Sequence, residues 1–162
     1  MTTTTESPFA SPFAEQYMAP VIEKMANHLA AQRRPSRISG GAASCAYRGV
    51  GQTSCAVGCL FSDEAYEKAG EPENLDVYQL LDTYEGDPIR DEAMAWKPQG
   101  MEDFDFFAAL SRAQNYHDGS DLVSIHYETR LDEFEGKPDA ELAAAITADL
   151  NAIVTKLWED AQ

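Results

Sequence analysis

The sequence predicts a mainly α-helical domain that carries one small β-hairpin, an α+β fold, behind a flexible N-terminal tail. Apolar residues recur at helical spacing along two long segments, one near each end of the chain. Residues 44–61 instead hold short runs of small, aromatic and β-branched residues around a glycine-containing loop, which is typical of a hairpin. Because 162 residues suffice for one hydrophobic core, residues 12–162 are expected to form a single compact domain.

The tail is expected over residues 1–11, which are rich in Thr, Ser and Pro. Ser-Pro-Phe-Ala occurs twice in tandem, at 7–10 and 11–14. Two interpretations are open: a chance duplication in a solvated tail, or a docking segment whose Phe9 and Phe13 insert into a partner.

The first helix is predicted from near Pro12 to Arg33, because Pro fits the first helical position and an apolar stripe follows. Pro20 is expected to kink this helix or to mark its true start. The predicted hairpin pairs Cys45–Arg48 with Ser54–Val57 and must pack on helices to be stable.

Beyond the hairpin, Ser62 is expected to cap a short helix, since two acidic residues follow it. The stretch 85–100, with two prolines and two glycines, is predicted to be irregular. Helices are further expected over 76–84, over 101–116, over 120–134 (where a strand is the alternative), and from Pro138 along the stripe Leu142, Ile146, Leu150, Ile153 and Leu157.

Charge divides the chain sharply. Residues 1–60 carry five basic and three acidic side chains, whereas residues 61–162 carry seven basic and twenty-five acidic ones, a balance of −18. Such an acidic lobe repels polyanions, so direct binding to nucleic acid or to an anionic membrane is not expected. Proteins with basic surfaces are the expected partners. No apolar run is long enough to span a bilayer, and the first residues lack the pattern of a secretory signal.

The cysteines offer two chemical hypotheses. A zinc site needs four thiolate or imidazole ligands, which Cys45, Cys55, Cys59 and His117 would supply, although the tight C-x2-C spacing of most zinc sites is absent. A cysteine nucleophile needs a base and an orienting group, and Cys55 with His117 and Asp118 has the right residue types. The plainer interpretation is that the cysteines are small buried apolar residues and that His117-Asp118 ends a helix.

Six carboxylates stand beside aromatic residues that look exposed, and they are the predicted partner-binding groups together with Phe9 and Phe13. They are Glu102, Asp103, Asp105, Asp132, Glu133 and Glu135. Neither the group over 102–105 nor the group over 132–135 has the spacing of a calcium-binding loop.

The segment Cys45-Ala-Tyr-Arg48, followed by Cys55-Ala-Val-Gly-Cys-Leu60 and then by Asp63, Glu64 and Tyr66, resembles a group of small uncharacterised proteins encoded by tailed phages and prophages. His28-Leu29 before the segment and His117-Asp118 after it also match. Phe61 stands where Ile is commoner, and the acidic stretch after Glu71 is not part of the pattern. The resemblance implies a phage origin and no mechanism.

The leading hypothesis is therefore a non-enzymatic, phage-encoded interaction protein acting in the host bacterial cytoplasm. Its acidic surface would bind a basic host or phage protein and inhibit a complex that handles nucleic acid or serves in defence. The alternatives are a zinc-binding or cysteine-dependent enzyme centred on Cys45, Cys55, Cys59 and His117, and a structural component of the virion.

Overall fold

The computed structural model describes residues 13–37 and 46–160, with side chains from Met18 onward. The predicted tail over 1–11, with Phe9, and Cys45 lie outside the described residues, as does the side chain of Phe13. The elements in chain order are α1 (Phe13–Gln32), a 3-10 turn η1 (Gly58–Leu60), α2 (Asp63–Lys68), α3 (Val77–Leu81), α4 (Pro88–Met94), α5 (Asp103–Asp118), α6 (Tyr127–Glu133) and α7 (Asp139–Asp160).

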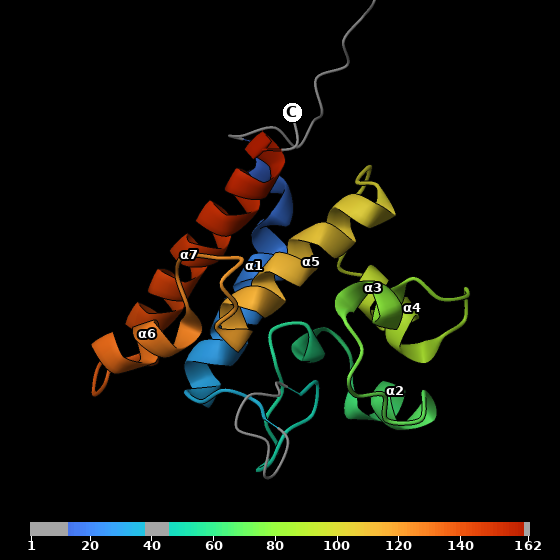
Figure 1. Ribbon diagram of the computed structural model, residues 1–162, viewed down its shortest axis with the longest axis horizontal. Helices are drawn as coiled ribbons and strands as arrows, with labels where there is room; N and C mark the ends of the chain where they lie inside the picture. Colours follow the sequence, from blue (N-terminus) through green and yellow to red (C-terminus); the bar gives the residue numbers. More distant parts are fainter. Residues whose placement is uncertain (1–12, 38–45, 161–162) are drawn as a thin grey trace, which may run out of the picture.

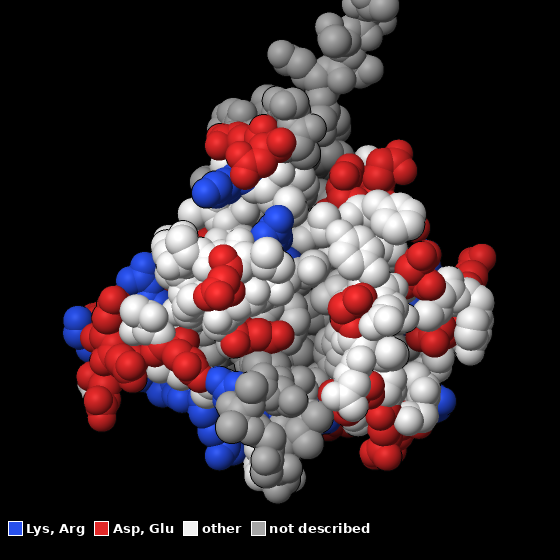
Figure 2. Space-filling model, viewed as in Figure 1, with Lys and Arg blue, Asp and Glu red and all other residues white. Residues whose placement is uncertain are grey.

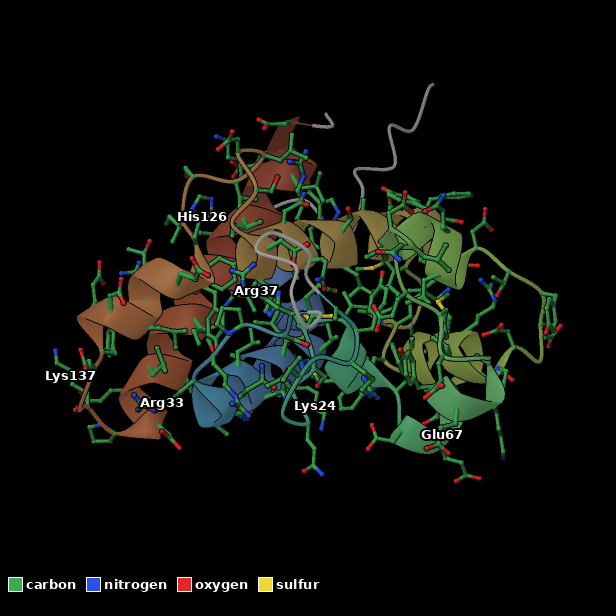
Figure 3. All side chains as sticks on the ribbon, turned by 60° about the horizontal axis from the view of Figure 1, so that its bottom comes forward. Lys24, Arg33, Arg37, Glu67, His126 and Lys137 are labelled. Carbon is green, nitrogen blue, oxygen red and sulfur yellow. The ribbon has the colours of Figure 1, made fainter. Side chains whose placement is uncertain are left out.

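The longest helices, α1 and α7, lie side by side and run antiparallel (Figure 1). The end of α1 meets the start of α7, where Arg33 Nε donates to Asp139 Oδ1 at 2.8 Å and the same guanidinium donates to the carbonyl of Lys137. Figure 3 shows Arg33 and Lys137 at this end of the molecule. Pro20 lies within α1, so it does not mark the start of the helix.

Helix α5 crosses this pair and carries buried side chains toward it along most of its length. Tyr116 and Tyr127 are among the largest fully buried residues of the core. The Tyr116 hydroxyl donates to Asp149 of α7 at 2.9 Å, and Arg130 of α6 binds both oxygens of that carboxylate, at 2.7 and 2.8 Å. Because Asp149 is almost fully buried, this charge is compensated inside the protein and not by water.

Helices α2, α3 and α4 form a smaller group beside the start of α5 (Figure 1). Side-chain caps fix where each begins: Ser62 caps α2, Asp76 caps α3 and Asp87 caps α4. The predicted helices at Ser62, over 76–84, over 101–116 and from Pro138 are confirmed, with shorter ends for α3.

The predicted β-hairpin over 44–61 is wrong. The described part of this segment contains no strand, and Gly49 and Thr53 form an isolated bridge. Side chains satisfy the backbone in place of a ladder, since the Arg48 guanidinium donates to the carbonyls of Gly58 and Phe61. The described residues form a mainly helical domain and contain none of the strands that the glycine-centred pattern suggested.

Two other expectations change. The stretch 85–100 contains α4, because Asp87 caps it and Pro88 occupies its first turn. Only Tyr127–Glu133 of the predicted helix over 120–134 is helical, and 120–126 form an irregular loop. Among the described residues, no helix has both the length and the apolar character needed to cross a bilayer.

Candidate protein-interaction surface

An aromatic cluster lies where α3 meets the first turn of α5. The rings of Tyr78 and Phe104 stack at a centroid distance of 6.4 Å and an interplanar angle of 25°. Phe107 meets both rings edge-on, at 6.1 and 5.7 Å, and is fully buried beneath them. Tyr78 and Phe104 remain 38% and 61% exposed, so two stacked rings face solvent from a fixed base.

Local sequence explains why these rings are held in place. Asp76 accepts a hydrogen bond from the Gln79 amide, and the Gln79 side chain accepts one from the Asp76 amide. This reciprocal capping box fixes the start of α3 and therefore the direction of Tyr78, two residues later. Leu75, just before the cap, adds a partly exposed apolar group to the same segment.

Carboxylates flank the cluster in both helices. Glu102 and Asp105 stand on either side of Phe104 at the start of α5, and the carboxylate of neither makes a hydrogen bond or an ion pair with the described residues. On α3, Asp76 and Asp82 are the residues at the two caps. We call Leu75, Tyr78 and Phe104 with Asp76, Asp82, Glu102 and Asp105 the aromatic–acidic patch. Figure 2 shows carboxylates on several sides of the pale surface in this region.

Asp103 has a different role from its two acidic neighbours. Its carboxylate binds Lys97 Nζ at 2.7 Å and Arg90 Nη2 at 3.2 Å. The hydrogen bond from Lys97, with Arg90 adding to it, holds the pKa of Asp103 below its ordinary value. Arg90 also lies 6.0 Å from the centre of the Phe107 ring. These cations anchor the start of α5 through Asp103.

The other predicted carboxylates do not join this surface. Asp132 and Glu133 lie at the end of α6 and Glu135 follows it, far along the molecule from the first turn of α5 (Figure 1). Glu133 pairs with Arg130 at 2.7 Å, whereas Asp132 and Glu135 are exposed without a partner among the described residues. The six carboxylates therefore form two separate groups. Of the predicted docking phenylalanines, Phe9 and the side chain of Phe13 are outside the described part.

The described cysteines are engaged with backbone. Cys55 is buried and its Sγ accepts a hydrogen bond from the Gly58 amide at 3.2 Å, while Cys59 Sγ donates to the Ala56 carbonyl at 3.0 Å. Burial raises the pKa of the Cys59 thiol to about 12 and that of Cys55 higher still. A nucleophilic cysteine needs the opposite shift, because the thiolate is the reactive form.

His117 also serves the structure. It is fully buried, its Nε2 accepts from the Ser36 amide at 3.0 Å, and its Nδ1 lies 2.9 Å from Asp118 Oδ1. Its ring stacks on Tyr127 at 5.8 Å. Because Ser36 donates to Nε2, the proton of the neutral ring is on Nδ1, directed at Asp118. No group of three or more metal-binding side chains comes together in residues 13–37 and 46–160; Cys45 is outside them.

A broad groove of about 870 Å³ lies between α1 and the segment that follows Arg48. Lys24 of α1 and Glu67 of α2 line it and project to the same side of the molecule (Figure 3). Other lining groups already have partners: His28 Nε2 lies 2.9 Å from both Oγ and the carbonyl oxygen of Ser54, and Arg48 binds Asp63. His28 and Arg48 are therefore engaged within the fold on the wall of this groove.

Sequence reasoning named the acids that flank Phe104 but did not name Phe104, Tyr78 or Leu75 as site residues. The D-x-x-Q spacing of Asp76 and Gln79 could have placed Tyr78 in the second position of a helix. No protein-family model, curated protein or solved structure matched the chain.

Proposed function

We propose that this chain is a non-enzymatic interaction protein and that its aromatic–acidic patch binds a basic segment of another protein. The observation that carries the proposal is the pair of stacked, solvent-facing rings of Tyr78 and Phe104 between unpaired carboxylates. A single exposed aromatic residue is ordinary on a protein surface, but a rigid exposed pair is typical of binding anchors.

The chemistry of the patch favours Arg-rich or Lys-rich partners. Glu102 and Asp105 attract cations, and the faces of Tyr78 and Phe104 interact favourably with a guanidinium or ammonium group. Arg is the better match, because its planar group stacks on a ring while it donates hydrogen bonds to carboxylates. The excess of eighteen negative charges over residues 61–162 would accelerate association with such a partner at low salt.

The resemblance of the cysteine segment to phage and prophage proteins supports a phage origin. A basic surface that normally holds nucleic acid is then the natural target, since a negative patch competes for the same cations as phosphate does. Inhibition of a host complex that handles nucleic acid, or of a defence complex, is the sharpest form of the proposal.

Two pairs of substitutions test the patch against overall charge. Glu102→Gln with Asp105→Asn removes two charges beside the rings, and Asp132→Asn with Glu135→Gln removes two charges at the end of α6. An Arg-rich peptide serves as the probe, measured by fluorescence anisotropy, and co-purification from infected cells identifies the natural partner.

The first pair is expected to weaken binding about tenfold at low salt, which corresponds to about 1.4 kcal/mol, and the second pair much less. Phe104→Ser is expected to weaken binding more than the first pair does. Leu122→Ser is the control, because Leu122 is 68% exposed but lies outside the aromatic–acidic patch, and it should leave binding unchanged. Equal weakening by both charge pairs, or binding that does not change between low and high salt, would contradict the proposal.

A further inference from the structure

A second groove, separate from the aromatic–acidic patch, runs between the C-terminal half of α7 and residues 121–125. Its volume is about 420 Å³. Its wall on α7 includes Ile153 and Leu157, and its opposite wall includes Leu122, Val123 and Ile125. The groove is therefore lined by branched apolar side chains on both sides.

No described residue covers this groove. Leu122 at its edge is 68% exposed, and Ile125, Ile153 and Leu157 are only partly buried. The rim is charged: Arg112, which donates to the Leu122 carbonyl at 3.0 Å, and Lys156 are positive, while Asp121 and Asp160 are negative. The ammonium group of Lys156 makes no hydrogen bond or ion pair with the described residues, so a carboxylate that binds there would gain a partner.

We propose that this groove binds the N-terminal segment of the same chain, with Phe9 as the anchor. The path of α1 supports this assignment. Arg33 at its end contacts Asp139 at the start of α7, so the antiparallel helices place Phe13 beside the last turns of α7. The first residue of α1, to which the N-terminal segment is joined, therefore lies at the end of α7 where the groove lies.

The distance to be covered is short. Four extended residues, from Phe13 to Phe9, reach about 13 Å, which matches the diameter of about 10–12 Å of a helix with its side chains. The whole segment of twelve residues reaches about 40 Å. Phe9 can thus pass around the end of α7 to the groove without unwinding α1.

The composition of the segment suits the groove. Pro8, Phe9 and Ala10 are apolar. A residue that precedes a proline favours extended backbone, so the Ser7-Pro8 order lowers the entropy to be lost on binding. Glu6 is the one charged side chain in residues 1–12, and it would lie three residues from Phe9, within reach of Arg112 or Lys156 at the rim.

Hydrogen exchange of the full-length protein tests the proposal. Phe9→Ala is compared with Thr4→Ala, a change in the same segment that removes no anchor. We expect amides of 121–125 and 153–157 to exchange about fivefold faster in Phe9→Ala than in Thr4→Ala, with no change over α3, because a buried Phe contributes about 1 kcal/mol or more. Equal exchange in the two variants would overturn the proposal.

A reciprocal variant and a peptide separate the possible occupants. Leu122→Glu places a charge on the groove wall and should increase the exchange of residues 5–10 without lowering the helical content. A synthetic peptide of residues 1–12, added to protein that lacks residues 1–11, should restore protection over 153–157. Protection that increases with protein concentration would show that a second copy supplies the segment and would overturn binding within one chain.

Discussion

The buried carboxylate of Asp149 provides the strongest single test of the core. Arg130 holds both of its oxygens, at 2.7 and 2.8 Å, and Tyr116 donates to one of them at 2.9 Å. The hydrogen bond to this carboxylate raises the pKa of Arg130. The pKa of Tyr116 is raised mainly by burial and further by the negative charge of Asp149. Arg130→Met would remove the compensating charge and leave Asp149 buried with one neutral donor.

Removing one partner of a buried ion pair costs about 3–5 kcal/mol, because the remaining charge is neither solvated nor paired. The Arg130 side chain is 26% exposed, so water reaches its vacated place and the lower end of the range, about 3 kcal/mol, applies here. For a domain of this size that corresponds to a fall in Tm of about 6–12 °C.

Urea unfolding, followed by far-ultraviolet circular dichroism, measures the change. The matched control is Glu133→Gln, which breaks the exposed contact of the same guanidinium and should cost less than about 0.5 kcal/mol. The double variant Arg130→Met with Asp149→Leu should be more stable than Arg130→Met alone, because no charge stays buried. If Arg130→Met costs no more than Glu133→Gln, the reasoning is refuted.

Three further predictions concern the segment beside α1. Gly58→Ala should destabilise the fold by about 2 kcal/mol in the same urea assay, since the added Cβ would lie 2.5 Å from the Tyr47 carbonyl oxygen; a neutral effect would contradict this packing. Burial lowers the pKa of His28 below 6.5, so the unfolded state binds the proton more readily and stability should fall as pH drops below about 6.5. His28→Gln should flatten that fall between about pH 7.5 and about pH 5.5, and an unchanged slope would exclude His28 as its source. In a Cys45→Ser background, the folded protein at about pH 8 should react with an alkylating reagent roughly a hundredfold or more slower than the urea-unfolded protein, because the pKa of Cys59 is about 12 and that of Cys55 is raised further; equal rates would exclude buried thiols.

The sequence predicted the helices whose ends and faces carry strong local signals. Pro138 and the apolar stripe after it located α7, and Ser62 located α2, because caps and periodicity act within a few residues. The hairpin failed for the opposite reason. The backbone of these strand-favouring residues bonds to side chains instead of to a second strand. The Gly58 carbonyl accepts from Arg48, and the Ser54 amide donates to Gln32, which is 22 positions away in sequence.

The candidate surface was predicted in part. Phe104 and its acidic neighbours stand together in the sequence, so their clustering was visible there. Tyr78 reaches Phe104 only through the packing of α3 on α5, and no spacing within one segment reveals that contact. For the same reason, the two acidic triplets looked equivalent in sequence although the fold places them apart.

The antiparallel pairing of α1 with α7 has a consequence for synthesis of the protein. Arg33 and Asp139, which meet at one end of that pair, are 106 positions apart, so α1 emerges from the ribosome long before its covering helix. Until Asp160 has left the exit tunnel, the apolar face of α1 remains open to chaperones and to premature association. Pairing of α1 with α7 is then a late step of folding with a substantial cost of loop closure.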